Sequence, residues 1–184
     1  MRQLLFVITI SIFFISCKET KNANTEISTN KKILITLPFS EEHFESNQKL
    51  YPYISENQQQ KIQNLIITQN PENSEIDYII QINNKMDFDT YVYFVSGDSS
   101  FSELINVKDE KIISSTLVGH QYPGYKTYET FLIEKDFSII IYDVEYETKV
   151  KKILEKYQVQ NDGTIKKIFS YRKKVDNSNY SAPN

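Results

Sequence analysis

From Asp77 onward the chain alternates short apolar segments with polar turns, and no other feature restricts its fold as strongly. Side chains two residues apart lie on the same face of a strand, so this alternation predicts strands that are buried on one face. We predict eight strands, at Tyr78–Ile82, Thr90–Ser96, Phe101–Val107, Ile112–Leu117, Tyr128–Ile133, Phe137–Tyr146, Lys151–Val159 and Ile165–Ser170. The short connections favour an antiparallel meander. The fold is therefore expected to be mainly β, as a sandwich or as one curled sheet, with an α+β arrangement left open.

The connection between the last two segments carries the clearest turn signal. Residues 160–164 read Gln-Asn-Asp-Gly-Thr, and glycine adopts a positive φ without steric cost. We therefore predict a hairpin with Gly163 in its turn. A β-branched residue at this position is expected to destabilise the protein.

The eight segments also fall into two sets of four with an offset near 50 residues. The third and fourth strands align best, because Leu104 to Ile112 and Tyr157 to Ile165 are both eight residues apart. Two four-stranded repeats are one interpretation, although two blades cannot close a propeller. The other interpretation is that any antiparallel meander shows such self-similarity.

One short helix is predicted before the strands, at about residues 56–67. Ser55 is a candidate N-cap, and Gln58 stands three residues later, as in a capping box. Three apolar residues then share one helical face: Ile62, Leu65 and Ile66. Asn70-Pro71 ends the helix. Further upstream, residues 32–39 are expected to form a strand that ends at the proline, or an extended segment that caps the core.

The first 17 residues carry a targeting signal. Arg2 provides a positive charge, residues 4–14 are an apolar run, and Ile15-Ser16-Cys17 ends it with a small residue before a cysteine. The run is shorter than the roughly 20 residues that a membrane-spanning helix needs. The segment resembles a bacterial lipoprotein signal peptide, in which the cysteine thiol receives a diacylglycerol. We predict a signal peptide at residues 1–16 and lipidation of Cys17; a plain membrane anchor and a buried first strand are the alternatives.

Composition divides the rest of the chain into a tether, a domain and a tail. The polar residues 17–30 are expected to form a flexible tether, residues 31–172 a single β-rich domain, and residues 173–184 a disordered tail. The chain has 21 basic and 24 acidic residues in a well-mixed order, so nucleic acid is not an expected partner. Cys17 is the only cysteine, and its lipidation would exclude a disulfide.

No motif points to catalysis, to a metal or to a cofactor. His43 and His120 have no partners at metal-ligand spacing, and a zinc site usually needs three or four ligands. Asp87 and Asp89 lack the further ligands of a calcium loop, so a polar turn is expected there. Residues 96–100 are typical of a turn and not of a nucleophile motif. We predict no catalytic residue, no metal site and no cofactor.

Residues 119–128 join the two halves of the strand region and are the candidate contact surface. They hold three tyrosines, a histidine and a lysine around Pro123-Gly124. Tyrosines on loops offer a large contact area at low entropic cost. The candidate binding residues are His120, Tyr122, Tyr125, Lys126 and Tyr128. The alternative is that Tyr122 and Tyr128 cover the end of the core.

A set of strand and turn residues between 101 and 165 has a recognisable order: Phe101, Leu104, Ile105, Lys111, Ile113, Ser115, Phe131, Asp136, Ile139, Lys156, Tyr157, Asp162, Gly163 and Ile165. Through these residues, the C-terminal half of the chain resembles a group of small Bacteroidetes lipoproteins. The resemblance implies a β-rich meander and a lipid anchor in the bacterial cell envelope, with the outer membrane as the expected location. In that group a charged motif after the cysteine directs surface export. Lys18-Glu19 matches only its start, so the periplasmic and surface faces both stay open.

These observations predict a non-enzymatic envelope lipoprotein that binds a protein or a glycan, with an inhibitor or an immunity protein as a specific form. A structural accessory subunit of an envelope complex is the first alternative. A hydrolase with an unrecognised carboxylate site is the second, and a deep cleft lined by converging carboxylates would favour it.

Overall fold

The computed structural model describes residues 35–51, 54–71, 75–82 and 85–171. They all belong to one compact unit, Lys32–Asn184. The predicted signal peptide, Cys17, the tether and the tail at 173–184 lie outside the described residues. Among the residues described, no helix is both long enough and apolar enough to cross a membrane.

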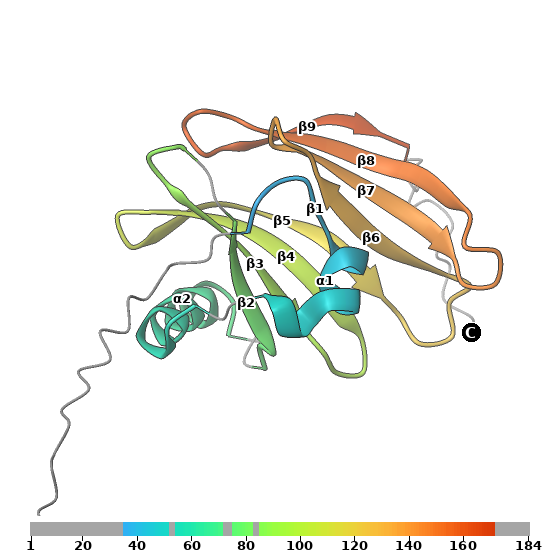
Figure 1. Ribbon diagram of the computed structural model, residues 1–184, viewed down its shortest axis with the longest axis horizontal. Helices are drawn as coiled ribbons and strands as arrows, with labels where there is room; N and C mark the ends of the chain where they lie inside the picture. The colour runs from blue at the N-terminus through green and yellow to red at the C-terminus, as the bar shows by residue number, and fades with distance from the viewer. Residues whose placement is uncertain (1–34, 52–53, 72–74, 83–84, 172–184) are drawn as a thin grey trace, which may run out of the picture. The chain divides into compact units, whose positions relative to one another are not determined.

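The described chain is mainly β, as predicted, and its nine strands form one sheet (Figure 1). The strands are β1 Phe39–Ser40, β2 Tyr78–Ile82, β3 Asp89–Val95, β4 Ser100–Lys108, β5 Lys111–Gln121, β6 Thr127–Ile133, β7 Ser138–Glu145, β8 Lys151–Val159 and β9 Ile165–Ser170. Strands β2 to β9 are neighbours in chain order, and every pair is antiparallel. All eight predicted strands are present within a few residues. The repeat hypothesis stays a prediction.

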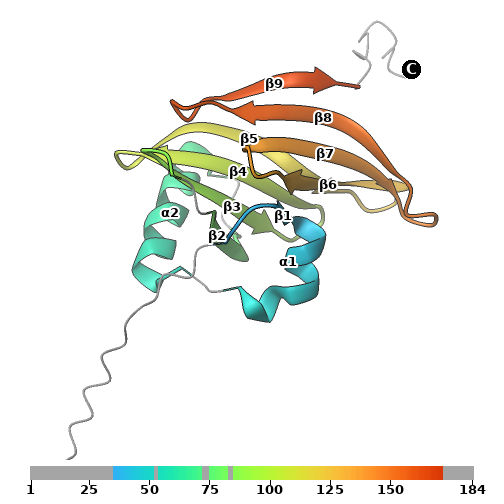
Figure 2. The ribbon, with the colours of Figure 1, turned by 45° about the horizontal axis from the view of Figure 1, so that its top comes forward.

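The sheet curls, so that of the two predicted arrangements the single curled sheet is the one found (Figure 2). The tip of the β8–β9 hairpin lies against β4 and β5, where the Gly163 carbonyl accepts hydrogen bonds from Asn106 Nδ2 at 2.8 Å and Ser114 Oγ at 2.5 Å. Asn106 is fully buried. A buried amide needs partners, and these contacts satisfy it while they hold the curl.

The predicted helix is α2, Glu56–Gln69. Ser55 caps it by accepting a hydrogen bond from the Gln58 amide at 3.4 Å, and Asn70 follows its last turn. Among the described residues, the Gln58 side chain makes no return hydrogen bond to the Ser55 amide, which a capping box would contain. Gln58 Nε2 instead donates to Gln81 Oε1 and to the Tyr91 hydroxyl, because α2 packs directly on the sheet.

The two faces of β2–β4 bury different clusters, as the period of two requires. On one face Ile62 and Ile66 of α2 pack on a set of strand residues: Ile79, Tyr91, Tyr93, Ile105 and Val107. On the other face the N-terminal segment fills the concave side of the sheet, with a cluster that includes Ile35, Phe39, Phe44, Ile80, Ile82, Val92, Leu104, Phe131, Ile133 and Ile139. This part of the sheet is therefore covered by α2 on one face and by β1 and α1 on the other.

The expectation that a strand ends at the proline was wrong for residues 35–38, and residues 32–34 of the predicted segment lie outside the described residues. Ile35 makes a single parallel bridge with Ile82, and the regular strand β1 begins after Pro38. Phe39 and Ile35 are buried, so the alternative of an extended segment that caps the core describes this region better. A short 3₁₀ turn, Gln48–Leu50, follows helix α1, Glu41–Asn47.

Helix α1, Glu41–Asn47, was not predicted. Ser40 caps it by accepting a hydrogen bond from the His43 amide at 3.2 Å. Phe44 is its only buried residue, and it stacks on Phe94 of β3 with ring centroids 4.7 Å apart. One apolar residue in seven gives no periodic hydrophobic signal in the sequence. The helix is therefore stabilised by its tertiary packing.

Strands β5 and β6 diverge soon after they meet. Their register contains one pair, His120 with Glu129, whereas β6 pairs with β1 at Leu132 and Ile133. Because β1 occupies that edge of β6, β5 cannot continue beside it. The sheet is thus open at the junction of its two halves, and α1 lies next to this opening.

Candidate functional site

A pocket of about 340 Å³ lies where β5 and β6 diverge. One wall is α1, and the others come from β3 and the β3–β4 turn, from β5 and β6, and from the β7–β8 turn. The lining is mainly polar, with carboxylates on α1 and β6: Glu41, Glu42, Glu45 and Glu129. The side chains that line the pocket also include two tyrosines, a histidine and a lysine beside these four carboxylates.

Glu41 begins α1 and points its carboxyl group toward the sheet. Oε1 accepts a hydrogen bond from Ser102 Oγ of β4 at 3.2 Å, and the Thr130 hydroxyl of β6 also acts on the carboxyl group. Gly119 of β5 leaves the space that the group needs: a Cβ there would lie 3.0 Å from Glu41 Oε2 and would overlap Ser102 Oγ. Glycine at 119 is therefore explained by close approach and not by a turn.

Burial raises the pKa of Glu41 from 4.5 to about 7, and the hydrogen bond from Ser102 opposes this rise. The neighbouring carboxylates of Glu45 and Glu42 add to the rise. The pKa of Glu45 is also raised, first by burial and then by Glu42. Desolvation and like charge both penalise ionisation. A carboxyl group that lines the pocket thus keeps its proton to a higher pH than an exposed glutamate does.

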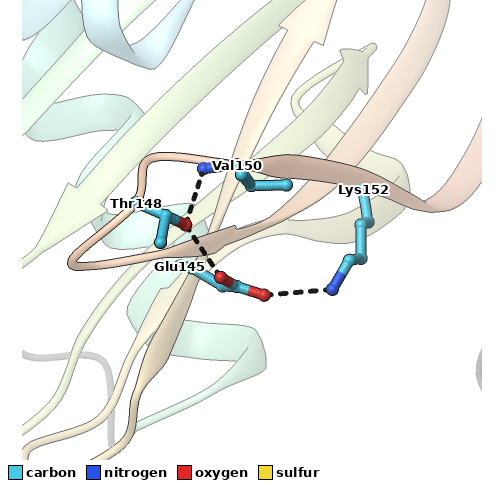
Figure 3. Close-up of polar contacts among 4 residues, drawn as sticks. All are labelled: Glu145, Thr148, Val150 and Lys152. Carbon is cyan, nitrogen blue, oxygen red and sulfur yellow. Dashed lines mark hydrogen bonds and ion pairs between the residues drawn. The ribbon is translucent and has the colours of Figure 1, made fainter.

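The β7–β8 turn forms the opposite rim. Thr148 Oγ1 donates to Glu145 Oε2 at 2.8 Å and accepts from the Val150 amide at 3.3 Å, while Lys152 Nζ binds Glu145 Oε1 at 3.0 Å (Figure 3). Hydrogen bonds from Thr148 and then Lys152 hold the pKa of Glu145 below its ordinary value. Lys149 has φ +56°, and its amide donates to the Glu145 carbonyl at 2.9 Å.

Lys149 lies over two tyrosine rings that are in contact and tilted by 40° to each other. Its Nζ is 5.4 Å from the centroid of the Tyr128 ring and 5.8 Å from that of Tyr146, and the two rings are 4.8 Å apart. A cation over an aromatic face is attracted by the ring quadrupole. This arrangement gives the pocket an aromatic wall with one positive charge.

A second pocket, of about 220 Å³, adjoins the first. It shares Ser100, Gln121 and Tyr146 with it and continues to Tyr122 and Tyr125. Gln121 Nε2 donates to the Tyr146 hydroxyl at 2.5 Å across the shared part. We call the two pockets together the groove. It extends from Glu41 at one end to the exposed tyrosines of the β5–β6 loop at the other.

Four of the five predicted binding residues line the groove. His120 and Tyr128 lie in the first pocket, and Tyr122 and Tyr125 in the second. Tyr122 packs on the His120 ring at 3.6 Å and on Tyr125 at 5.2 Å between centroids, while 46% and 65% of Tyr122 and Tyr125 stay exposed. Lys126 lines neither pocket; its carbonyl accepts from the Tyr146 amide.

The loop itself is shorter than predicted, because residues 119–121 belong to β5 and residues 127–128 to β6. Sequence reasoning missed Glu41, Glu45, Tyr146 and Lys149 as groove residues. Their sequence neighbourhoods carry no binding motif. They meet the predicted loop only because β1 pairs with β6 and the β7–β8 turn folds back beside it.

Other predicted polar segments make structural contacts. Asp87 forms an ion pair with Lys108 at 2.6 Å, and Asp89 accepts from Gln81 Nε2 at 2.8 Å. His43 is exposed on α1, and its ring lies edge-on to Tyr51. Across the described ranges, no three His, Cys, Asp or Glu side chains are arranged to hold a metal ion. Residues 97–99 form the bend between β3 and β4, and Ser96 and Ser100 line the first pocket.

Comparison with known proteins gives no relative: no family model matches the chain, and neither a curated protein nor a solved structure is significantly similar to it. The groove is therefore the feature from which a function has to be inferred.

Proposed function

We propose that this protein is a lipid-anchored lipoprotein of the bacterial cell envelope that binds a glycan in the groove. The observation that carries the proposal is that two small polar pockets adjoin each other and share Ser100, Gln121 and Tyr146 in their linings. Two adjoining pockets suit an extended ligand made of small polar units. The anchor is argued from Cys17 and its preceding apolar run, and the outer membrane is the proposed location.

The groove offers the two kinds of contact that a sugar needs. Sugar rings present C–H groups on their faces, which pack on aromatic rings, and the tyrosine rings supply such platforms: Tyr122, Tyr125, Tyr128 and Tyr146. Sugar hydroxyls need hydrogen-bond partners at the edges. Carboxylates and the Gln121 amide line the same walls and supply donors and acceptors.

A protein partner fits this site less well. Protein interfaces usually centre on a buried apolar anchor with few charged groups at the core. The first pocket has the opposite composition, because carboxylates from α1 and β6 line it. The exposed apolar residues of β9, Ile168 and Phe169, lie outside the groove.

The test is binding of envelope oligosaccharides to the full-length protein in detergent, screened on a glycan array and measured by calorimetry. Tyr122→Ala with Tyr125→Ala should weaken binding at least tenfold while thermal unfolding stays close to wild type, because both rings are largely exposed. Tyr171→Ala is the matched control, since Tyr171 is 70% exposed and lies outside the groove. Equal affinity for the double variant and the wild type would refute a sugar site at these rings.

Hydrolysis is a second candidate, favoured by one observation. Glu41 holds a proton near pH 7 in the same pocket as Glu129 and Glu45, and glycosidases use one protonated and one ionised carboxyl group. If the bound glycan is cleaved, Glu41→Gln should abolish turnover and leave binding intact. Intact glycan after prolonged incubation with the wild-type protein would argue for binding alone.

A further inference from the structure

The last strand of the sheet, β9, is largely exposed to solvent. The sheet runs in order from β2 to β9, so among the described residues β9 pairs only with β8 and forms an edge (Figure 2). Its exposed residues include two large apolar side chains, Ile168 at 56% and Phe169 at 44%. Ile153 of β8 is 38% exposed. Apolar side chains gathered on one surface mark a contact with a partner or a membrane more often than apolar residues scattered singly do.

The register of the last three strands shows which side chains share a face with Phe169. Paired residues on antiparallel strands place their side chains on the same side of the sheet, and so do residues two apart along one strand. Positions 138, 140 and 142 of β7 therefore lie on one face with their partners on β8 and β9. We call this surface the lysine face, and its exposed or half-buried members include Ile140, Tyr142, Ile153, Lys156, Lys166 and Phe169.

The opposite face of the same strands packs inward. Ile139 of β7 is fully buried, and its partner on β8 is Tyr157. Glu155 is 4% exposed, and it accepts hydrogen bonds from the Tyr157 hydroxyl at 2.5 Å and from Lys167 Nζ at 2.8 Å. Lys167 is therefore neutralised on the inner side, and the lysine face is the side that meets solvent.

The charge of this region is opposite to that of the chain. Strands β8 and β9 carry five lysines and one glutamate, whereas the whole chain has a formal net charge of −3. Three of the five lysines are in ion pairs: Lys151 with Glu42, Lys152 with Glu145 and Lys167 with Glu155. Within the part of the chain that the structure describes, no ion pair includes Lys156 or Lys166. The lysine face thus presents two unneutralised positive charges beside exposed apolar side chains.

We propose that the lysine face docks on the anionic surface of a lipid membrane. Lipid phosphates match the two lysines, and the apolar region below the headgroups receives Ile153 and Phe169. An acidic polysaccharide would supply the negative charge but no apolar phase for these side chains. A second copy paired along β9 would bring the lysines of both copies together, and like charges on neighbouring strands destabilise their pairing.

The proposed lipid anchor keeps this face close to a membrane, so the inference rests on the anchor and not on the glycan site. The 17 residues 18–34 separate Cys17 from Ile35. A chain of this length spans at most about 60 Å when it is fully extended. The domain therefore stays within reach of the membrane surface. None of the six named residues of the lysine face lines either pocket of the groove, so docking and glycan binding use different side chains.

Tryptophan fluorescence tests the docking, because the chain contains no tryptophan and a single introduced indole reports only its own surroundings. Phe169→Trp places the reporter on the lysine face. Tyr125→Trp is the matched control on the β5–β6 loop, where Tyr125 is 65% exposed. The lipidated protein is reconstituted into phosphatidylcholine vesicles with or without phosphatidylglycerol, and brominated acyl chains serve as the quencher. The Phe169→Trp reporter should be quenched in the anionic vesicles and much less in the neutral ones, whereas the Tyr125→Trp reporter should be quenched in neither.

The contribution of charge is measured in the Phe169→Trp background. Lys156→Gln with Lys166→Gln should lower the ratio of docked to undocked protein about 30-fold, since a lysine near an anionic surface contributes about 1 kcal/mol. Lys49→Gln with Lys111→Gln removes the same charge from two exposed positions outside the lysine face and should leave this ratio close to that of the parent. High salt should also weaken docking, because it screens the attraction.

Three results would overturn the proposal: equal quenching of the two reporters, equal quenching in neutral and anionic vesicles, or equal docking of the two double-lysine variants. A blue shift of the Phe169→Trp reporter that grows with protein concentration in detergent alone would assign the face to a second copy, and would overturn it too. Flotation with neutral vesicles measures the anchor separately, so a failed anchor and a failed docking face give different results. A protein that floats with neither kind of vesicle overturns both.

Discussion

Replacement of Gly163 by alanine tests the packing of the β8–β9 turn against the rest of the sheet. Gly163 has φ +84°, its amide donates to the Gln160 carbonyl at 3.0 Å, and its own carbonyl binds Asn106 and Ser114. An added Cβ would overlap Ile113 Cδ1 and lie 3.2 Å from Phe88 Cδ1. The substitution therefore meets two separate penalties, one in the backbone and one in the packing.

The magnitudes can be assigned separately. A left-handed backbone costs an alanine about 1–2 kcal/mol. The added Cβ must also displace Ile113 Cδ1, the end of a side chain that is 37% exposed, and forcing such a side chain off its rotamer costs about 0.5–1.5 kcal/mol. We expect Gly163→Ala to lower the free energy of unfolding by about 1.5–3.5 kcal/mol. Gly124 is the matched control, because it has φ +80° and nothing within 4 Å of an added Cβ. Gly124→Ala should cost only the backbone term, about 1 kcal/mol.

Urea denaturation of the full-length protein at fixed pH measures both variants. Ile113→Ala removes the overlapping atom, so in that background Gly163→Ala should cost no more than Gly124→Ala does in the wild type. The m-values should stay equal if the folded state keeps its compactness. Equal destabilisation by the two glycine substitutions would contradict the close packing of the turn against Ile113 of β5.

Two further predictions concern the anchor and the β4–β5 turn. Metabolic labelling with a fatty-acid analogue should mark the wild type in the membrane fraction, whereas Cys17→Ser should lose both the label and the membrane association; a labelled Cys17→Ser protein would contradict the anchor. Asp109 and Glu110 both adopt positive φ, so Glu110→Gly should raise the free energy of unfolding by about 0.5–1 kcal/mol despite the loss of its exposed ion pair with Lys61. Glu110→Gln is the control and should give no gain, because it removes the ion pair and keeps the strained backbone.

The strands and turns were predictable because their signals are local. Apolar residues between polar turns mark a strand in segments such as residues 101–107, and this holds whichever strand lies beside it. Which faces are covered was not visible locally, since residues 104–107 are all buried. The Asp162-Gly163 pair likewise specified its turn, since only the local backbone decides the need for a positive φ. Helix α2 was found from the Ser55 cap and the spacing of Ile62 and Ile66. Its contact with Tyr91 through Gln58 was not, because Tyr91 is 33 residues away in the chain.

The candidate site likewise has one part that was predictable from the sequence and one part that was not. The tyrosine-rich loop was visible in the sequence, because a dense group of aromatic residues around Pro123-Gly124 is a local feature. The carboxylates that complete the groove were not visible. Glu41 lies in a seven-residue helix with a single buried residue, and neither its spacing nor its composition distinguishes it from an ordinary surface glutamate.

The sequence by itself therefore determined the strands, the order in which they succeed one another, the sharp turns and the loop that presents Tyr122 and Tyr125. The tertiary structure alone decided that β1 takes the edge of β6, that β5 and β6 part beyond the His120–Glu129 pair, and that Glu41 enters the space beside Gly119. The physical reason is the range of the interactions. A strand or a turn is specified by the residues that form it, whereas a pocket exists only where distant segments compete for the same edge and leave a space between them.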